Sequence, residues 1–334
     1  MKILAIESSC DETAAAVVED GVKVYSNVIA SQIAIHQATG GVMPEVAARE
    51  HIKVIMPTIE LAISQAGVSW NEIDAIAVTK EPGLIGSLIV GRITAAAVAF
   101  AKDKPLIEVN HIHGHMYAGW LESETLPEFP ILILTVSGGH NELVLMRGHG
   151  EFEILGETID DAAGEAFDKI ARLLKLGYPG GPIIEKTAVL GNSKAVKFPR
   201  ALKGDYDFSF SGLKTSVLYH LQANEAKLDN PSFVADVAAS FQSAVIDSLV
   251  EKLMKGVVEF SPKEIHLSGG VSANKALRGE IESQLKKLKN VAHFRVPKKM
   301  SYCTDNAAMI GAAAYFLGKS SCDDLESSTS KVTS

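Results

Sequence analysis

Cysteine is scarce in this chain of 334 residues. It contains only Cys10, Cys303 and Cys322, which lie far apart and form no CxxC pair. A disulfide framework needs an even set of cysteines, and a cysteine-based zinc site needs closely spaced pairs. Both are excluded, and we expect the thiols to be reduced.

Long apolar runs are also missing. A membrane helix needs about 20 apolar residues, whereas the longest uncharged apolar stretches, 95–101 and 131–136, suit a buried helix turn and a strand. Glu7, Asp11 and Glu12 stand where a signal peptide would carry its apolar segment. We therefore expect neither a membrane span nor secretion, and we predict a cytoplasmic protein.

Positive charge is not in excess. The chain has 32 Lys and Arg against 40 Asp and Glu, a net charge of −8, which excludes a protein that binds nucleic acid over its whole surface. A polynucleotide partner would have to meet a local patch, and the densest basic segments are 194–203 and 286–299. With 47% hydrophobic residues at this length, two globular lobes are expected.

Two familiar nucleotide-binding motifs are absent. The lack of GxxxxGKS/T excludes a P-loop, and the lack of GxGxxG after the first expected strand argues against a Rossmann site. Three other glycine-rich turns follow expected strands: VSGGHN at 136–141, YPGGP at 178–182 and LSGGVSAN at 267–274. Each alone is a weak signal, because tight turns also use glycine. Together they predict a nucleotide-binding cradle.

The pattern of strands and helices is repeated along the chain. Expected strands at Ile3–Ser8 and Thr13–Val18 form a hairpin, and ILAIESSCDETAAAVV from Ile3 can be laid over ILTVSGGHNELVLM from Ile133. Further helices are expected at 44–66, 111–120, 161–176 and 230–258, and further strands at 74–79, 106–109 and 265–268. This alternation predicts an α/β fold of two duplicated lobes, with a boundary in the polar stretch 121–130.

The segment NHIHGH carries the sharpest chemical signal. His111 and His115 stand four residues apart and therefore share one helix face, the spacing that two imidazoles need to bind one metal ion. Asp305 in TDNAAMIG is the natural third ligand. Two histidines and one carboxylate leave coordination positions open, so such a site would be catalytic rather than structural. The alternative is that these histidines cap a helix or fill the core.

Acidic pairs are the other candidates for chemistry. Asp11 and Glu12 lie in the turn that overlays SGGH, which favours a functional role for them. Asp160 and Asp161 are better explained as helix caps or as part of a solvated face. Asp168 lies in a third acidic group, GEAFDK.

Ten ordered motifs resemble the bacterial branch of the tRNA adenosine threonylcarbamoyltransferase family, known as the TsaD family. They are ESSCDETA at 7–14, HQATGGVMPEVAAREH at 36–51, PGLIGSLIVG at 82–91, NHIHGH, VSGGHNEL, GEAFDK, YPGGP, FSFSGLKT at 208–215, SGGVSAN and CTDNAAMIG. The resemblance runs from Lys2 to about Gly318, which is almost the whole chain.

This resemblance implies an actin-like and Hsp70-like ATPase (ASKHA) fold of two duplicated lobes, each with a central mixed sheet covered by helices. Lobe I is expected at 1–128 plus 303–320 and lobe II at 129–302, with a disordered tail at 321–334. The implied activity is transfer of the threonylcarbamoyl group from threonylcarbamoyl-AMP to N6 of adenosine 37 in tRNAs that read ANN codons.

The resemblance also assigns residues and partners. By the family pattern, His111, His115 and Asp305 would hold one divalent metal ion, iron (Fe2+) or zinc (Zn2+), and Asp11 and Glu12 would be catalytic. The implied substrate-binding residues are Thr135, Val136, Ser137, Gly138, Gly139, Asp168, Gly181, Glu185 and Asn274. The implied partners are the tRNA anticodon loop, a smaller TsaB-like paralogue and a TsaE-like ATPase.

Three other functions stay open at this point. Paired histidines also occur in metallopeptidases, although the HExxH motif is missing here. A non-catalytic scaffold of the same fold would be expected to have lost the three presumed metal ligands. A sugar or acetate kinase of the same superfamily would be expected to lack the NHIHGH helix.

Overall fold

The computed structural model describes residues 1–39, 41–288 and 293–330. Its contacts divide the chain into two compact units. Unit 1 comprises Met1–Pro127, Arg147–Glu151 and Pro297–Ser334, and unit 2 comprises Glu128–Met146 and Phe152–Val296. These bounds differ from the expected lobes, and unit 2 begins at Glu128 rather than at residue 129. The turn Arg147–Glu151 belongs to unit 1, and the chain returns to unit 1 at Pro297 rather than at residue 303.

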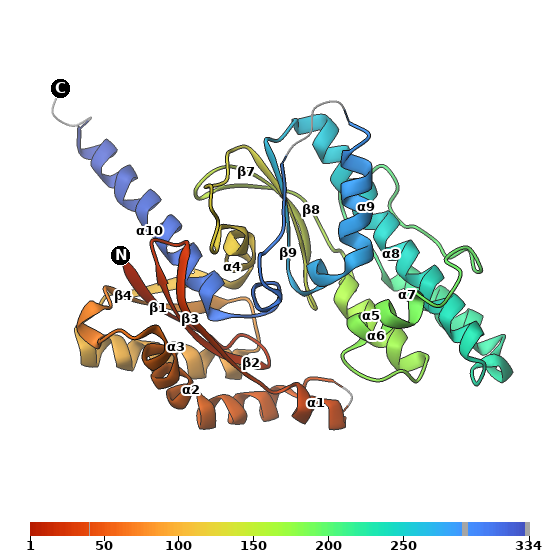
Figure 1. Ribbon diagram of the computed structural model, residues 1–334, viewed down its shortest axis with the longest axis horizontal. Helices are drawn as coiled ribbons and strands as arrows, with labels where there is room; N and C mark the ends of the chain where they lie inside the picture. Colours follow the sequence, from red (N-terminus) through yellow and green to blue (C-terminus); the bar gives the residue numbers. More distant parts are fainter. Residues whose placement is uncertain (40, 289–292, 331–334) are drawn as a thin grey trace. The chain divides into compact units, whose positions relative to one another are not determined.

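The sheet of unit 1 has five strands (Figure 1): β1 (Lys2–Glu7), β2 (Glu12–Glu19), β3 (Lys23–Ser31), β4 (Ala75–Glu81) and β5 (Leu106–Asn110). Their order is β3-β2-β1-β4-β5. The pairs β1–β2 and β2–β3 are antiparallel, and β1–β4 and β4–β5 are parallel. The three parallel strands therefore end at one edge of the sheet, where polar groups that follow them come together.

Helices cover both faces of this sheet because its central strands are apolar on both sides. Leu4 and Ile6 of β1 pack on α2 (Pro44–Ala66) and α3 (Ile85–Lys102). Ala5 lies between Leu4 and Ile6 in β1, so its side chain points to the opposite face of the sheet. A Cβ placed at Gly311 of α10 (Ala307–Ser330) would lie 3.4 Å from this side chain, so α10 packs on that face. Figure 1 shows α2 and α3 on one side of the sheet and α10 on the other.

Two short α-helices, three 3-10 turns and the end of α10 complete unit 1. They are α1 (Ile33–Thr39), α4 (His111–Tyr117) and the 3-10 turns at Trp70–Glu72, Ala118–Trp120 and Met300–Tyr302. Helix α10 continues to Ser330, within the segment for which disorder was expected, and residues 331–334 lie outside the described residues.

Unit 2 repeats the topology of unit 1. Its strands are β6 (Ile131–Val136), β7 (Asn141–Gly148), β8 (Glu151–Glu157), β9 (Glu264–Ser268) and β10 (His293–Arg295). Their order is β10-β9-β6-β7-β8, which is the order of unit 1 with each strand replaced by its counterpart. Strands β6, β9 and β10 are parallel neighbours, and β6–β7 is antiparallel. The predicted α/β duplication is confirmed.

The helices of unit 2 pack around α8 (Pro231–Phe260), whose residue Phe241 is fully buried beside Phe167. The others are α5 (Ala163–Leu173), α6 (Gly180–Ala188), α7 (Ser211–Gln222) and α9 (Lys275–Leu285), with 3-10 turns at Glu225–Lys227 and Gly270–Ala273. Pro231 and Asn230 explain where α8 begins, because proline suits the first helical turn and the Asn230 side chain accepts a hydrogen bond from the Ser232 N–H.

Two helices are long and apolar enough to cross a membrane by length and composition alone, namely α3 and α8. Helix α8 is a core helix, with 78% of its apolar window buried. In α3 that share is 28%, and Arg92 within it pairs with Glu108. Neither helix is an uncharged apolar run of the kind that the sequence analysis looked for, because each has charged residues within its apolar stretch.

Candidate functional site

The end of β5 positions the two histidines of NHIHGH. Asn110 is the last residue of β5, and its side-chain oxygen accepts hydrogen bonds from the N–H groups of Ile112 (2.8 Å) and His113 (3.3 Å). This cap starts α4 directly at His111. One helical turn later His115 lies on the same face, and both imidazoles are buried. The expected helix is present, and Ala118–Trp120 continues it as a 3-10 turn.

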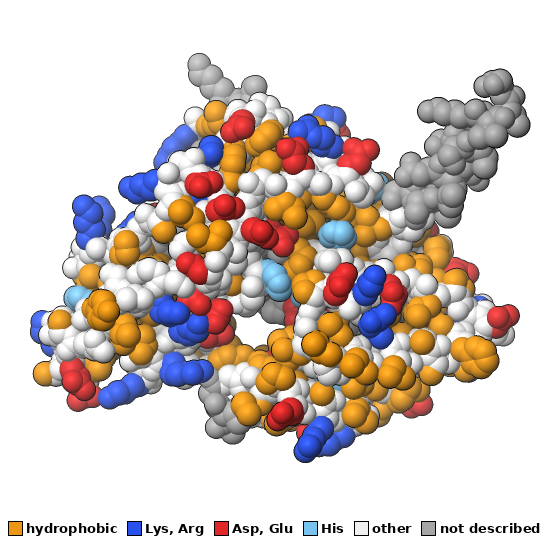
Figure 2. All heavy atoms as spheres, turned by 180° about the vertical axis from the view of Figure 1, so that it is seen from behind, with side chains coloured by type: hydrophobic (Ala, Val, Ile, Leu, Met, Phe, Trp, Pro, Cys, Tyr) orange, Lys and Arg blue, Asp and Glu red, His pale blue; other side chains and the backbone are white. Residues whose placement is uncertain are grey.

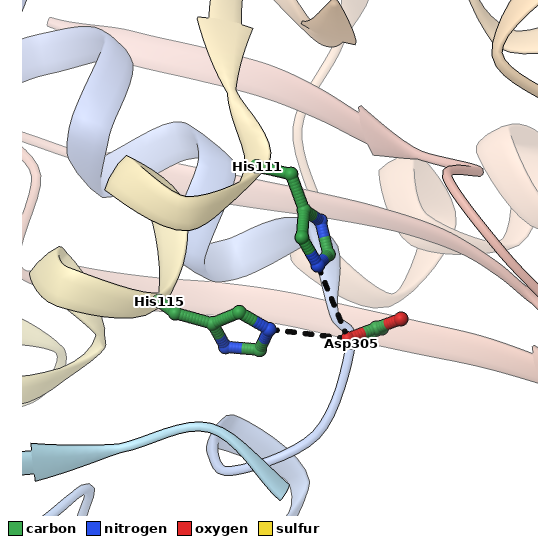
Figure 3. A group of neighbouring side chains, drawn as sticks. All are labelled: His111, His115 and Asp305. Carbon is green, nitrogen blue, oxygen red and sulfur yellow. Dashed lines mark hydrogen bonds and ion pairs between the residues drawn. The ribbon is translucent and has the colours of Figure 1, made fainter. Parts of the chain in front are cut away.

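Asp305 lies against both imidazoles (Figure 3). Its Oδ1 atom is 3.2 Å from Nε2 of His115 and 3.5 Å from Nε2 of His111. The two rings stand nearly perpendicular, with centroids 4.7 Å apart. The segment before α10 therefore delivers the carboxylate, 190 residues away from His115 in the sequence, to the face of α4.

These three side chains fit a divalent transition metal. One ligand atom from each lies within 4.8 Å of the others, and two imidazole nitrogens with one carboxylate oxygen suit iron or zinc better than magnesium or calcium. Three protein ligands leave at least one position open for a substrate oxygen. The arrangement can therefore hold a catalytic ion.

The carboxylates and imidazoles of the cluster stabilise one another's charged forms. Burial disfavours ionisation of the Asp305 carboxyl, but the two imidazoles outweigh it and hold the pKa of Asp305 well below its usual range. Burial likewise opposes a charged His111, whereas the carboxylates of Glu7 and Asp305 raise the pKa of His111 to about 10. The cluster is thus a buried, strongly polar site rather than a patch of core histidines.

Glu7 is a residue of this site that the sequence reasoning did not single out. It ends β1, has no exposed surface, and its Oε2 atom lies 3.2 Å from Nδ1 of His111. Its Oε1 atom accepts a hydrogen bond from the Ser9 N–H at 2.5 Å, and the Thr79 hydroxyl donates to Oε2. One sequence signal was available: Glu7 is the last residue of KILAIE, an otherwise apolar strand that is buried from Ile3 onward.

The turn after β1 carries Asp11 and Glu12. Ser31 donates a hydrogen bond of 2.7 Å to Oε1 of Glu12, while Oε2 is buried with no hydrogen-bond partner among the described residues. Burial, with smaller contributions from Asp11 and Asp305, raises the pKa of Glu12 to about 7. Burial and the charge of Asp305 also raise the pKa of Asp11. A carboxylate with a pKa near neutrality is suited to accept a proton.

Burial disfavours the charged form of Glu12 in the folded state, and the raised pKa that results predicts that the free energy of unfolding depends on pH. The pKa of Glu12 is about 7 when folded against 4.5 as the ordinary value, so its contribution to stability decreases as the pH rises from about 4.5 to 7. We expect Glu12→Gln to be more stable than wild type at pH 8 by on the order of 1 kcal/mol, and little different at pH 4.5. Denaturant unfolding of the metal-free proteins measures this, and an equal difference at both pH values would contradict it.

Buried side chains hold this turn in place. Nε2 of His51 donates to the Cys10 carbonyl at 3.0 Å, and the Thr13 hydroxyl lies 2.7 Å from Nδ1 of the same ring. The Ser87 hydroxyl donates to the same carbonyl at 3.2 Å. At Gly83 an added Cβ would lie 2.5 Å from the Ser9 carbonyl oxygen, so glycine allows this close approach. The motifs at 36–51 and 82–91 therefore support the turn.

In unit 2, the SGG turn follows β6 as predicted. The Ser137 N–H donates to the His140 carbonyl at 2.8 Å, and Gly138 and Gly139 are exposed with open space where a Cβ would lie. Thr135 and Val136 are buried at the strand end, and the Thr135 hydroxyl lies 3.0 Å from that of Ser268. The buried end of β6 thus holds the turn in place, while the backbone at Gly138 and Gly139 is exposed.

Two other glycines pack on this turn, and sequence reasoning missed their role. A Cβ at Gly164 would lie 2.5 Å from the Ser137 carbonyl oxygen, and one at Gly269, whose φ is +83°, would lie 2.4 Å from that of Val136. Only glycine allows these approaches. The turns after β6 and β9 and the start of α5 therefore meet in unit 2.

The remaining predicted residues of unit 2 bind backbone groups. Asp168 Oδ1 accepts a hydrogen bond from the Gly180 N–H at 2.6 Å, and Glu185 Oε1 accepts one from the Lys275 N–H at 2.6 Å. Asn274 caps α9 through the Leu277 N–H. Gly181 has open space beside it. These contacts hold the turns after 178 and 268 in place.

The Asp160–Asp161 pair has structural partners. Asp160 accepts hydrogen bonds from the Phe210 N–H (2.8 Å) and the Ser211 N–H (3.3 Å) at the start of α7. Asp161 pairs with Lys169 and Lys214. A capping role, the simpler interpretation of the sequence, accounts for Asp160.

The chain closely matches known proteins over nearly its whole length. A model of the family described as tRNA N6-adenosine threonylcarbamoyltransferase matches residues 23–312. A protein of that name from Symbiobacterium thermophilum is 53% identical over 316 residues, which cover 94% of this chain and 91% of the relative. Another from Dehalococcoides mccartyi is 52% identical over 317 residues, covering 95% and 93%.

A solved structure shows the same fold at low sequence identity. HypF of T. kodakarensis superposes with a TM-score of 0.64 and 16% identity, over 95% of this chain and 48% of that one. This likeness concerns the fold alone. With the two matching sheets it confirms the predicted actin-like ATPase (ASKHA) fold.

Proposed function

Because the chain belongs to the tRNA N6-adenosine threonylcarbamoyltransferase family, we propose that it transfers the threonylcarbamoyl group of threonylcarbamoyl-AMP to N6 of adenosine 37 in tRNAs that read ANN codons. The observation that carries the proposal is the His111–His115–Asp305 cluster in a chain that is more than half identical to a relative of that name. An acyltransferase of this kind needs carbonyl activation, leaving-group stabilisation and a base.

A divalent ion held by His111, His115 and Asp305 would act as a Lewis acid toward the carbonyl and phosphate oxygens of the donor. The donor set favours Fe2+ or Zn2+. We propose one such ion per subunit. The cluster of ligand atoms within 4.8 Å supports this.

Glu12 is the residue best suited to take the proton from the attacking amine. The exocyclic amine of adenosine is a weak nucleophile, so a base must remove its proton as the new C–N bond forms. The Oε2 atom of Glu12 has no hydrogen-bond partner among the described residues and its pKa is about 7. Asp11, one residue earlier, would keep the local potential negative.

The glycine-rich turns of unit 2 are proposed to bind the adenylate. Backbone N–H groups of Ser137, Gly138 and Gly139 would stabilise charge on the donor's phosphate and carbonyl oxygens, worth several kcal/mol when aligned. Thr135 and Val136 would line the same region. Asp168, Gly181, Glu185 and Asn274 would bind the rest of the nucleotide, directly or by holding the turns that do.

Reconstitution tests the proposal. Unmodified tRNA is incubated with the metal-loaded protein and synthetic threonylcarbamoyl-AMP, with and without partner proteins, and its nucleosides are separated and identified by mass spectrometry. We expect a mass shift on adenosine that matches one threonylcarbamoyl group. Release of peptides from a protein substrate without any tRNA product would instead favour a metallopeptidase.

A partner surface supports the proposal that a TsaB-like paralogue and a TsaE-like ATPase assist the reaction. Helix α3 presents an exposed apolar face formed by Ile85, Ile89, Ile93 and Phe100, with exposed fractions of 77%, 49%, 66% and 91%. Figure 2 shows hydrophobic side chains gathered over this part of unit 1. Apolar area of this extent favours a protein partner, and partners would add to the positive surface that this acidic chain can offer to tRNA. We propose that they meet in the cytoplasm.

We expect Ile93→Asp to weaken binding of the paralogue by at least about tenfold, because a charge would be buried at the centre of the contact. Ile154→Asp, which changes an isoleucine of unit 2 that is 59% exposed, is the matched control and should bind normally. Titration by calorimetry with the purified paralogue measures both. Equal affinities for the two variants would exclude the α3 face as the contact.

A further inference from the structure

Glu7 makes three contacts that together fix its orientation. It is fully buried, and its Oε1 atom accepts the Ser9 N–H while its Oε2 atom faces the Thr79 hydroxyl and Nδ1 of His111. A backbone N–H can only donate, so Oε1 is committed to Ser9. The other oxygen is left to accept a hydrogen bond from the imidazole.

This contact determines which nitrogen of His111 can bind a metal ion. A carboxylate can only accept, so Nδ1 of His111 must carry the proton that it shares with Glu7. Nε2 is then the nitrogen that can give up its proton to bind a cation, and it is the one that faces Asp305 at 3.5 Å. Carboxylates that hold a metal-bound histidine in this way typically strengthen metal binding.

We propose that Glu7 is a positioning residue that holds His111 in the tautomer and orientation required for metal binding. It also links the metal centre to the turn carrying Asp11 and Glu12, through the Ser9 N–H. The inference rests on the proposed metal site. His115 differs in this respect, since its Nδ1 atom is buried with no hydrogen-bond partner among the described residues.

The test is Glu7→Gln in the full chain. The Ser9 N–H requires an oxygen at the Oε1 position, so the new amide group must place its NH2 toward His111 Nδ1. That nitrogen then becomes an acceptor, and the imidazole proton moves to Nε2, where it blocks the cation. We expect zinc affinity, measured by competition with a chromophoric chelator, to decrease by about 10- to 100-fold.

Ser9→Ala is the matched control. The Ser9 hydroxyl also lies 3.2 Å from Nδ1 of His111, but its removal leaves the carboxylate in place, so zinc affinity should stay at the wild-type value. Circular dichroism of the metal-free variants shows whether each is folded. A folded Glu7→Gln that binds zinc as tightly as wild type would overturn the inference.

A measurement on the zinc-loaded wild type is independent of any variant's folding. In 15N-histidine spectra, His111 should be protonated at Nδ1 and ligated at Nε2, with its signals identified by their loss in His111→Ala. Ligation through Nδ1 would overturn the inference. Both readouts need no tRNA, so they can fail while the proposed transfer reaction stands. Loss of tRNA product with normal zinc binding would count against the transfer reaction alone.

Discussion

Asp305→Ala is expected to lose its bound metal ion and to lower the rate of threonylcarbamoyl transfer by at least about a hundredfold. The ion would contribute several kcal/mol to the transition state, and each 1.4 kcal/mol or so corresponds to a factor of ten in rate. Without the carboxylate, the two imidazoles alone would hold the ion weakly, since Asp305 contacts both of them within 3.5 Å.

Metal content by mass spectrometry and single-turnover transfer to tRNA measure these two effects. Glu60→Ala, which removes an exposed acid from α2 of the same unit, controls for the change in net charge and should behave as wild type. If Asp305→Ala kept both its metal and its rate, the cluster would have no part in the reaction.

Glu12→Gln is expected to reduce the transfer rate by about 10²- to 10⁴-fold, the usual contribution of a general base. The sign of the pH dependence follows from its raised pKa. The carboxylate form is the base, so wild-type activity should increase about tenfold per pH unit below a pKa of about 7 and level off above it.

The rate of Glu12→Gln should be flat over the same pH range, because the amide does not titrate there. Glu60→Gln provides the matched control and should retain the wild-type profile. The measurement is single-turnover transfer at saturating donor from pH 5.5 to 8.5, with tRNA integrity checked at each pH. A Glu12→Gln variant with the full rate and an unchanged profile would move the role of base to Asp11 or to the substrate.

The sequence was sufficient to predict His111 and His115 as neighbours, because helical periodicity alone places residues four apart on one face. Asp305 was a weaker prediction, since its position depends on how α10 packs. That packing uses Gly114, where an added Cβ would lie 2.7 Å from Ile310. Glu7 was not predicted, because only the fold brings the end of β1 beside α4.

The fold shows the same division between local and long-range information. The hairpin repeat was visible because β1–β2 and β6–β7 have apolar strands around short polar turns. Strands β3 and β8 were missed, because both lie at sheet edges and alternate too little in polarity. The helix expected at 161–176 is shorter in the structure, where α5 runs from Ala163 to Leu173. Asp160 and Asp161 lie before its start, and their carboxylates bind the Phe210 N–H and Lys214 instead.

Anomalous diffraction from crystals of the zinc-loaded protein, recorded on both sides of the zinc absorption edge, tests the metal centre most directly. We predict one strong peak about 2.0–2.2 Å from Nε2 of His111, Nε2 of His115 and a carboxylate oxygen of Asp305. A map with no peak among these three side chains, at a zinc concentration that supports transfer to tRNA, would contradict it.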